Sequence, residues 1–169
     1  MNYFELFEIP VQLNVDKADI QKKFYALSRK YHPDFFSQAT EIEQQEVLER
    51  SSLLNKAWKT FQRPEDTIKY VLQLKQLLEE EEKYELPPSF LMNIMDINEQ
   101  VMEAKSVNSS EVIQALRTTI DQLQKEMYEP VKEVIENYQE GITTKEELLQ
   151  VKDYYYKKKY LYRILDGLP

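Results

Sequence analysis

The stretch KYHPDFF, residues 30–36, contains the only histidine of a 169-residue chain and places it directly before a proline and an aspartate. Upstream of it, apolar and aromatic residues recur at helical spacing, at Ile20, Phe24, Leu27 and Tyr31. This periodicity predicts a helix that begins after the capping residue Asp16. Because a proline disfavours helical backbone at the residue before it, we expect the helix to end near Tyr31 and the His-Pro-Asp residues to lie in a loop.

A second long helix is predicted downstream, because apolar side chains line one face of the segment that follows the loop, at Val47, Leu54, Trp58 and Phe61. The two helices can pack as an antiparallel hairpin, with the His-Pro-Asp loop exposed where they join. A short apolar helix at residues 3–7, stopped by Pro10, precedes them.

The rest of the chain is also predicted to be helical. A helix is expected to start at Pro64 and to stay apolar to about residue 82, and the stretch EEEEKYELPPS, residues 79–89, marks a linker or a sharp turn. Three further helical segments are expected, at about 89–105, 110–139 and 144–166. Pro130 either kinks the middle segment or divides it into two helices. The short connections favour an antiparallel three-helix bundle.

Composition narrows the class of protein. Hydrophobic residues make up 42% of the chain and charged residues 31%, with a mean hydropathy of −0.63, which is typical of a soluble protein. No apolar run approaches the roughly 20 residues of a membrane helix, and MNYFELFEIP at the N-terminus lacks the regions of a secretory signal. Cysteine is absent, which excludes disulfides and thiolate ligands. We therefore expect a cytoplasmic protein without a membrane partner.

Charge is spread unevenly along the chain. Residues 1–78 contain 11 Lys and Arg against 11 Asp and Glu, whereas residues 79–169 contain 11 against 19, which accounts for the net charge of −8. A nucleic-acid partner is not expected, because phosphate contacts need local positive charge. Two halves with different electrostatics suggest two different protein partners.

The residue types needed for most catalytic sites are missing. One histidine and no cysteine cannot build the Glu-x-x-His pairs of a helical metal site or a multi-histidine hydrolase site. Only two glycines, Gly141 and Gly167, are present, so no glycine-rich phosphate loop can form. A proline between His32 and Asp34 also argues against a buried catalytic relay. We expect no enzyme activity, no metal and no cofactor.

Two patterns point to protein binding. The cations of the first long helix, Lys22, Lys23, Arg29 and Lys30, lie off its apolar stripe and lead up to the His-Pro-Asp loop. Such a face can be plain solvated surface, and the tripeptide alone can be a simple turn. The absence of acidic residues between Ile20 and Tyr31 makes a docking strip more plausible.

The segment from Phe90 onward has two apolar faces. One face is predicted to lie in the bundle core and contains Phe90, Ile94, Ile97 and Val101. The other contains Leu91, Met95 and Met102, with Met92 and the acids Asp96, Glu99 and Glu103 nearby. A helix of this kind is either buried on both sides or offers one face to a partner. Methionine's adaptability and the flanking acids favour a binding surface.

Several stretches match a known family. YFELFEIP (3–10), YHPD (31–34) and LLNKAWKTFQRPEDTIKYVL (53–72) resemble a J-domain, and PPSFLMNIMDINEQVMEA (87–104) resembles the first helix of the C-terminal domain of the HscB type of J-domain co-chaperone. The resemblance covers essentially the whole chain. It implies an all-α, L-shaped fold with a J-domain at 1–75, formed by an antiparallel helical hairpin and short helices. A connecting helix end and linker at 76–88 and a three-helix bundle at 89–169 would follow.

The resemblance also implies a function. HscB proteins stimulate the ATPase of an HscA- or DnaK-type chaperone and deliver the iron–sulfur scaffold protein IscU to it. The implied chaperone-binding residues are Lys22, Lys23, Arg29, Lys30, His32, Pro33 and Asp34. The implied scaffold-binding residues are Leu91, Met92, Met95, Asp96, Glu99, Glu103 and Tyr155.

Some of these expectations leave alternatives open. The last helix reads VKDYYY where the family has a VKLR-like stretch, so Tyr154 is an alternative to Tyr155, and core packing is an alternative to binding. A J-domain co-chaperone with a different client is the alternative function. The oligomeric state is open, with a monomer favoured.

Overall fold

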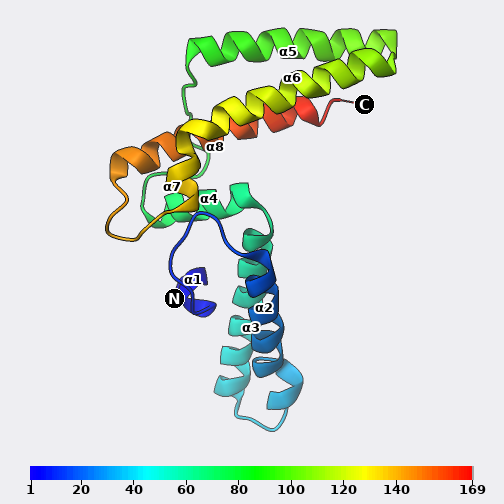
Figure 1. Ribbon diagram of the computed structural model, residues 1–169. Coiled ribbons are helices and arrows are strands. Elements are labelled where there is room, and N and C mark those ends of the chain that lie inside the picture. The colour runs from blue at the N-terminus through cyan, green and yellow to red at the C-terminus, as the bar shows by residue number, and fades with distance from the viewer. Residues whose placement is uncertain (169) are drawn as a thin grey trace. The chain divides into compact units, whose positions relative to one another are not determined.

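The computed structural model describes residues 1–168, in which all regular secondary structure is helical (Figure 1). The all-α expectation is therefore confirmed. The chain divides into two compact units, of which the first contains residues 1–71 and 138–142 and the second contains residues 72–137 and 143 onward. The unit boundary lies close to the predicted end of the first domain at residue 75, although the second unit also includes the predicted linker.

In the first unit, α2 (Lys17–Lys30) and α3 (Glu41–Gln62) lie side by side as a helical hairpin (Figure 1). Phe24 of α2 stacks on Trp58 of α3, with 4.4 Å between the ring centroids. The short helix α1 (Tyr3–Leu6) adds Phe4, which lies 5.2 Å from the Phe61 ring, and Phe7 follows at 5.3 Å. These aromatic rings close the core at the end of the hairpin away from the His-Pro-Asp turn.

Local capping residues set the ends of both hairpin helices. The Asp16 carboxylate accepts hydrogen bonds from the backbone N–H groups of Ala18 and Asp19. Thr40 and Glu43 form a capping box at the start of α3. Between the helices lies a short 3₁₀ turn, η1 (Pro33–Phe36), which begins at the expected break in the helix. The hairpin therefore presents this turn at its tip.

Helix α4 (Pro64–Leu74) is shorter than predicted. The expectation of a helix to about residue 82 is wrong, because the chain leaves the helix through a left-handed residue, Gln76, with φ of 58°. The Leu77 N–H then donates to the Leu72 carbonyl at 2.9 Å, and the Gln76 N–H donates to Gln73 at 3.0 Å. This is the hydrogen-bond pattern of a Schellman motif, which ends a helix. The apolar residues Leu77 and Leu78 follow this motif and are therefore not part of α4.

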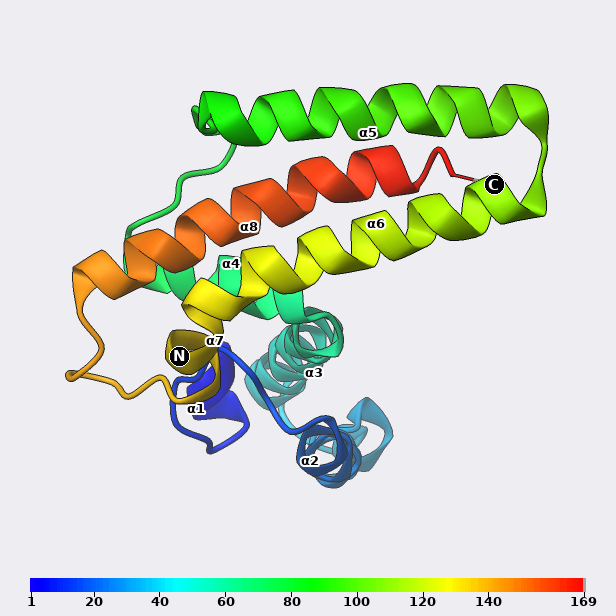
Figure 2. The ribbon, with the colours of Figure 1, turned by 45° about the horizontal axis from the view of Figure 1, so that its top comes forward.

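The second unit is built on three long helices, α5 (Pro88–Val107), α6 (Ser110–Tyr128) and α8 (Lys145–Leu165), which lie alongside one another (Figure 2). Their buried core contains Phe90, Ile94, Ile97, Val101, Ala104, Leu116, Ile120 and Leu161. Pro130 divides the middle predicted segment, so that a 3₁₀ turn, η2 (Glu129–Val131), and the short α7 (Lys132–Glu136) follow α6. This settles the choice between a kink and a break.

No helix within residues 1–168 combines the length and apolar character needed to cross a bilayer.

Candidate docking surfaces

The His-Pro-Asp turn is exposed and is stabilised by hydrogen bonds among its own residues. His32 caps η1, and its Nδ1 atom accepts a hydrogen bond from the Asp34 N–H at 3.3 Å. Pro33 occupies the first position of the turn, where the absent N–H costs nothing. The Asp34 carboxylate, 88% exposed, lies 3.6 Å from the same imidazole nitrogen. The two functional groups are thus presented to solvent on a stiff turn and do not form a buried relay.

The predicted basic residues precede this turn on α2. Lys22, Arg29 and Lys30 are exposed, and Lys22 and Arg29 share one helix face because they are seven residues apart. Lys23 is half-buried, with its ammonium 3.6 Å from the Asp19 carboxylate. The structure therefore leaves three of the four predicted cations exposed and pairs the fourth within its own helix.

Sequence reasoning missed two aromatic side chains beside the turn. Phe35 is 74% exposed and Tyr25 is 51% exposed, and both line a shallow hollow together with Arg29, His32 and Asp34. A large apolar side chain is normally buried, so the place of Phe35 in a polar loop was the sequence signal that could have identified it. The candidate chaperone surface therefore has an aromatic as well as a cationic part.

The second predicted surface is the outer face of α5, which comprises Leu91, Met92, Met95, Asp96, Glu99, Met102 and Glu103. Met92 is 67% exposed and Met95 is 64% exposed, while Leu91 is half-buried. The three acids are exposed, and the opposite face of the helix lies in the bundle core. The structure therefore favours the partner-binding alternative over burial on both sides.

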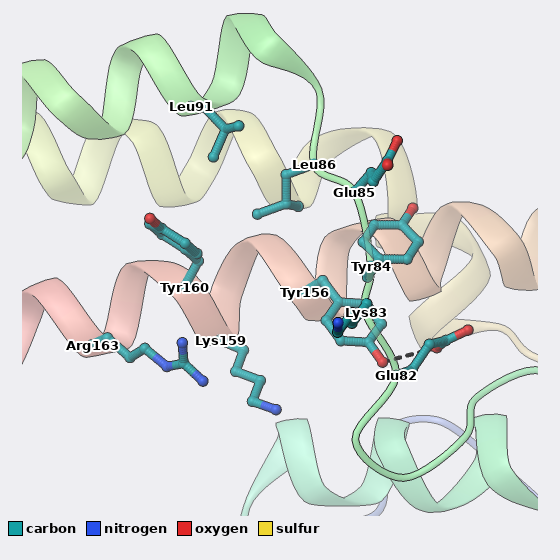
Figure 3. Close-up of a pocket in the computed structure, with 10 residues that line it drawn as sticks. All are labelled: Glu82, Lys83, Tyr84, Glu85, Leu86, Leu91, Tyr156, Lys159, Tyr160 and Arg163. Carbon is teal, nitrogen blue, oxygen red and sulfur yellow. Dashed lines mark hydrogen bonds between the residues drawn. The ribbon is translucent and has the colours of Figure 1, made fainter.

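Beside this face lies a hollow of about 590 Å³ between α8 and the segment that precedes α5 (Figure 3). We call it the Leu91 hollow, and its apolar and aromatic lining consists of Tyr84, Leu86, Leu91, Tyr156 and Tyr160. The Tyr84 and Tyr156 rings are stacked, with centroids 4.5 Å apart and planes 8° from parallel. The hollow thus extends the apolar part of the outer face of α5 onto α8.

The structure buries Tyr155, the aromatic residue predicted to bind the scaffold from the last helix. Tyr155 is only 7% exposed, and so is the alternative Tyr154, so neither side chain presents a usable surface. One residue further along α8, a rotation of about 100° turns Tyr156 out of the core and into the Leu91 hollow. The structure therefore brings Tyr156 and Tyr160 together with Leu91, in place of Tyr155.

A network of polar contacts holds the hollow's wall in place. Glu82 forms an ion pair of 2.7 Å with Lys152 and accepts a hydrogen bond of 2.9 Å from the Tyr156 hydroxyl. The Tyr84 hydroxyl donates to Asp153 at 2.9 Å. Burial and then this bond raise the pKa of Tyr84 to about 12, so its hydroxyl stays protonated at neutral pH.

No metal site accompanies these surfaces in the part of the chain that the structure describes, residues 1–168. No three His, Asp or Glu side chains there are placed so that they could hold an ion.

The chain is similar to known proteins over most of its length. Residues 86–168 match the family model described as "HSCB C-terminal oligomerisation domain". The "Co-chaperone protein HscB homolog" of Neisseria meningitidis is 31% identical over 127 residues, which cover 75% of this chain and 76% of that protein. The chain belongs to the HscB family. The resemblance inferred from the sequence motifs is thereby confirmed.

Other HscB proteins support the assignment. The human "Iron-sulfur cluster co-chaperone protein HscB" is 35% identical over 116 residues, which cover 68% of this chain and 49% of the human protein, about half its length. The crystal structure of human HscB matches with a TM-score of 0.80 at 29% identity, over 98% of this chain and 79% of that one. HscB from Vibrio cholerae matches with a TM-score of 0.74 at 24% identity, over 97% and 93%, which supports the fold.

Proposed function

We propose that this HscB-family chain is a non-enzymatic co-chaperone with two docking sites. The His-Pro-Asp turn and the cations of α2 stimulate the ATPase of an HscA- or DnaK-type chaperone. The outer face of α5 binds an IscU-type iron–sulfur scaffold protein and thereby delivers it to that chaperone. The proposal agrees with the names of the relatives, which are co-chaperones and, for the human protein, an iron–sulfur cluster co-chaperone.

The observation that carries the first part is the placement of His32 and Asp34. Both side chains are exposed at the tip of a helical hairpin, directly after Arg29 and Lys30. Cations at this place would guide an acidic surface of the chaperone to the turn, because complementary charge mainly sets the encounter rate and orientation. Asp34 can then accept charge-assisted hydrogen bonds from the partner.

A single-turnover ATPase assay with the cognate chaperone tests this part. We expect His32→Gln to bring the stimulated rate close to that of the chaperone alone, because the turn loses the side chain that caps it and faces the partner. Lys56→Gln, an exposed position on α3, serves as the control and should stimulate like the unchanged protein. Full stimulation by His32→Gln would refute the proposed mechanism.

A cytoplasmic location and a monomeric state are further parts of the proposal. The first is an expectation drawn from the composition of the chain, and the second is open to a direct test because the matched family model includes oligomerisation in its description. Sedimentation of the purified chain at micromolar concentration should give the mass of a single 20.3 kDa protein.

A further inference from the structure

Two cations on α8 lie at the rim of the Leu91 hollow. Lys159 and Arg163 are four residues apart, so they share one face of the helix, and both are exposed. Figure 3 shows both side chains on the same side of α8. Within residues 1–168, neither lies within ion-pair distance of a carboxylate. The Lys159 ammonium also lies over the Tyr156 ring, 6.0 Å from its centroid. Since no carboxylate of the described residues is paired with either cation, their charge is available to a ligand.

The acids near these cations do not neutralise them. Glu82 lines the same hollow, but it is paired with Lys152 and also accepts the Tyr156 hydroxyl bond. Glu85 also lines it, and Figure 3 shows its carboxylate directed away from Lys159 and Arg163. The cationic rim is notable because residues 79–169 contain 11 Lys and Arg against 19 Asp and Glu. Most of this unit would repel an anionic ligand.

The hollow itself suits an apolar side chain. Its walls include Leu86, Leu91 and the stacked rings of Tyr84 and Tyr156, and Tyr160 is partly exposed at its edge. Both stacked tyrosines are fixed by their hydroxyl bonds, so little side-chain entropy is lost when a ligand packs against them. A ligand with an apolar group and a neighbouring carboxylate would match both the wall and the rim.

The charges on the two sides of the outer face of α5 differ in sign. On a helical wheel, Met102 and Met95 lie about 20° and 40° from Leu91, and the acids lie about 80° to 140° from it in the same direction. Leu91 itself lines the hollow, and so do the two α8 cations. The apolar stripe therefore has a cationic border on α8 and an anionic border formed by Asp96, Glu99 and Glu103. A partner with the complementary arrangement can bind in only one orientation.

We propose that the Leu91 hollow binds an acidic segment of the client protein, with an apolar side chain inside and a carboxylate at Lys159 and Arg163. The inference rests on the proposed function, because it takes the outer face of α5 as the client site. The guanidinium of Arg163 can hold a carboxylate through two parallel hydrogen bonds, and the Lys159 ammonium adds a point charge. The two charged borders then orient the client along α5.

The first test is a titration of IscU-type scaffold into the full chain. Lys159→Gln with Arg163→Gln should weaken binding about tenfold at low salt, since charge-assisted bonds of this kind contribute about that much. The loss should shrink at high salt, where the unchanged protein also binds less well. The control is Lys125→Gln with Lys132→Gln, which removes the same charge from exposed positions on α6 and α7. Thermal melts by circular dichroism check that both variants fold.

The second test does not depend on the scaffold. The blocked peptide acetyl-Glu-Leu-Phe-Glu-amide is compared with acetyl-Gln-Leu-Phe-Gln-amide by chemical-shift mapping of the ¹⁵N-labelled chain. We expect the acidic peptide to shift amides around Tyr156, Lys159 and Arg163 at several-fold lower concentration, and the double variant to abolish this preference.

The two tests separate the two proposals. If the scaffold fails to bind but the acidic peptide is preferred, the scaffold proposal fails and the acidic-segment site stands. If the scaffold binds equally well to the double variant at every salt concentration and the two peptides behave alike, the site is refuted while the scaffold proposal stands.

Discussion

Glu82 shows how a single side chain holds one wall of the candidate client site. Its carboxylate accepts bonds from Lys152 and Tyr156, which join the segment before α5 to α8. The bond from Lys152 is the main reason that the pKa of Glu82 lies below its ordinary value of 4.5. A lowered pKa means that the folded state favours the ionised form, so ionised Glu82 stabilises the fold.

The pH dependence of this contribution follows from its sign. Glu82→Gln should lower the free energy of unfolding by about 1 kcal/mol at pH 7. The Glu82–Lys152 ion pair is only partly exposed, with 25% and 11% of the two side chains accessible to solvent, so water weakens it less than it weakens a fully exposed pair. The contribution is fully present above pH 4.5 and is lost as pH falls through the lowered pKa. Urea unfolding at pH 7 and at pH 3 should therefore show a difference between the two proteins that shrinks in acid.

The control for Glu82 is Glu80→Gln, an exposed change of the same charge in the same segment. It should alter stability little at either pH. A stability difference for Glu82→Gln that is unchanged at pH 3 would mean that the ion pair is not its source.

Helix α5 has one face that packs in the bundle core and one face that is exposed. Its inner face supplies Phe90, Ile94 and Ile97 to the bundle core, and its outer face leaves Met92 and Met95 exposed. Burial of apolar side chains of this size under a partner lowers the free energy of the complex, and methionine adapts to irregular surfaces. The exposed outer face therefore supports the proposed client site. Truncation of the inner-face side chains, by contrast, would destabilise the bundle.

The outer face can be tested separately from the fold. Met92→Ala with Met95→Ala should weaken scaffold binding about tenfold or more, because two apolar groups central to the contact are removed. Isothermal titration measures this, with Leu149→Ala on α8 as a control truncation at a partly exposed site. Absent binding, or binding that is indifferent to both methionines, would favour a J-domain co-chaperone with a different client.

At the scale of the whole molecule, the chain carries two candidate sites in two separate compact units. The His-Pro-Asp turn belongs to the first unit, and the outer face of α5 belongs to the second. The sites share no side chain, and mutations at sites without shared partners usually have additive effects. Delivery of a client to a chaperone requires both sites in one chain, although each site binds its own partner.

This separation predicts that the two functions can be removed one at a time. His32→Gln should leave the scaffold dissociation constant unchanged, and Met92→Ala with Met95→Ala should leave chaperone stimulation measured without scaffold unchanged. Titration and the single-turnover assay, each applied to both variants, provide the check. Loss of both functions in either variant would show that the sites are coupled.

Features that depend on neighbours along the chain could be predicted from the residues alone. The cap at Asp16, the turn at Pro33 and the break at Pro130 all lie where the sequence predicts them, because capping bonds and proline sterics act over a few residues. The division of the apolar residues of α5 into two faces also followed from helical periodicity, whereas the exposure of the second face came from the structure.

Features that depend on residues distant in sequence became visible only in the folded chain. The burial of Tyr155 and the exposure of Tyr156 to the Leu91 hollow depend on which faces of α8 the other helices cover. The hollow brings Tyr84 together with α8 residues about 70 positions away, and no local pattern encodes that distance. The early end of α4 was missed because its apolar residues continue beyond the helix, into core positions that only packing could reveal.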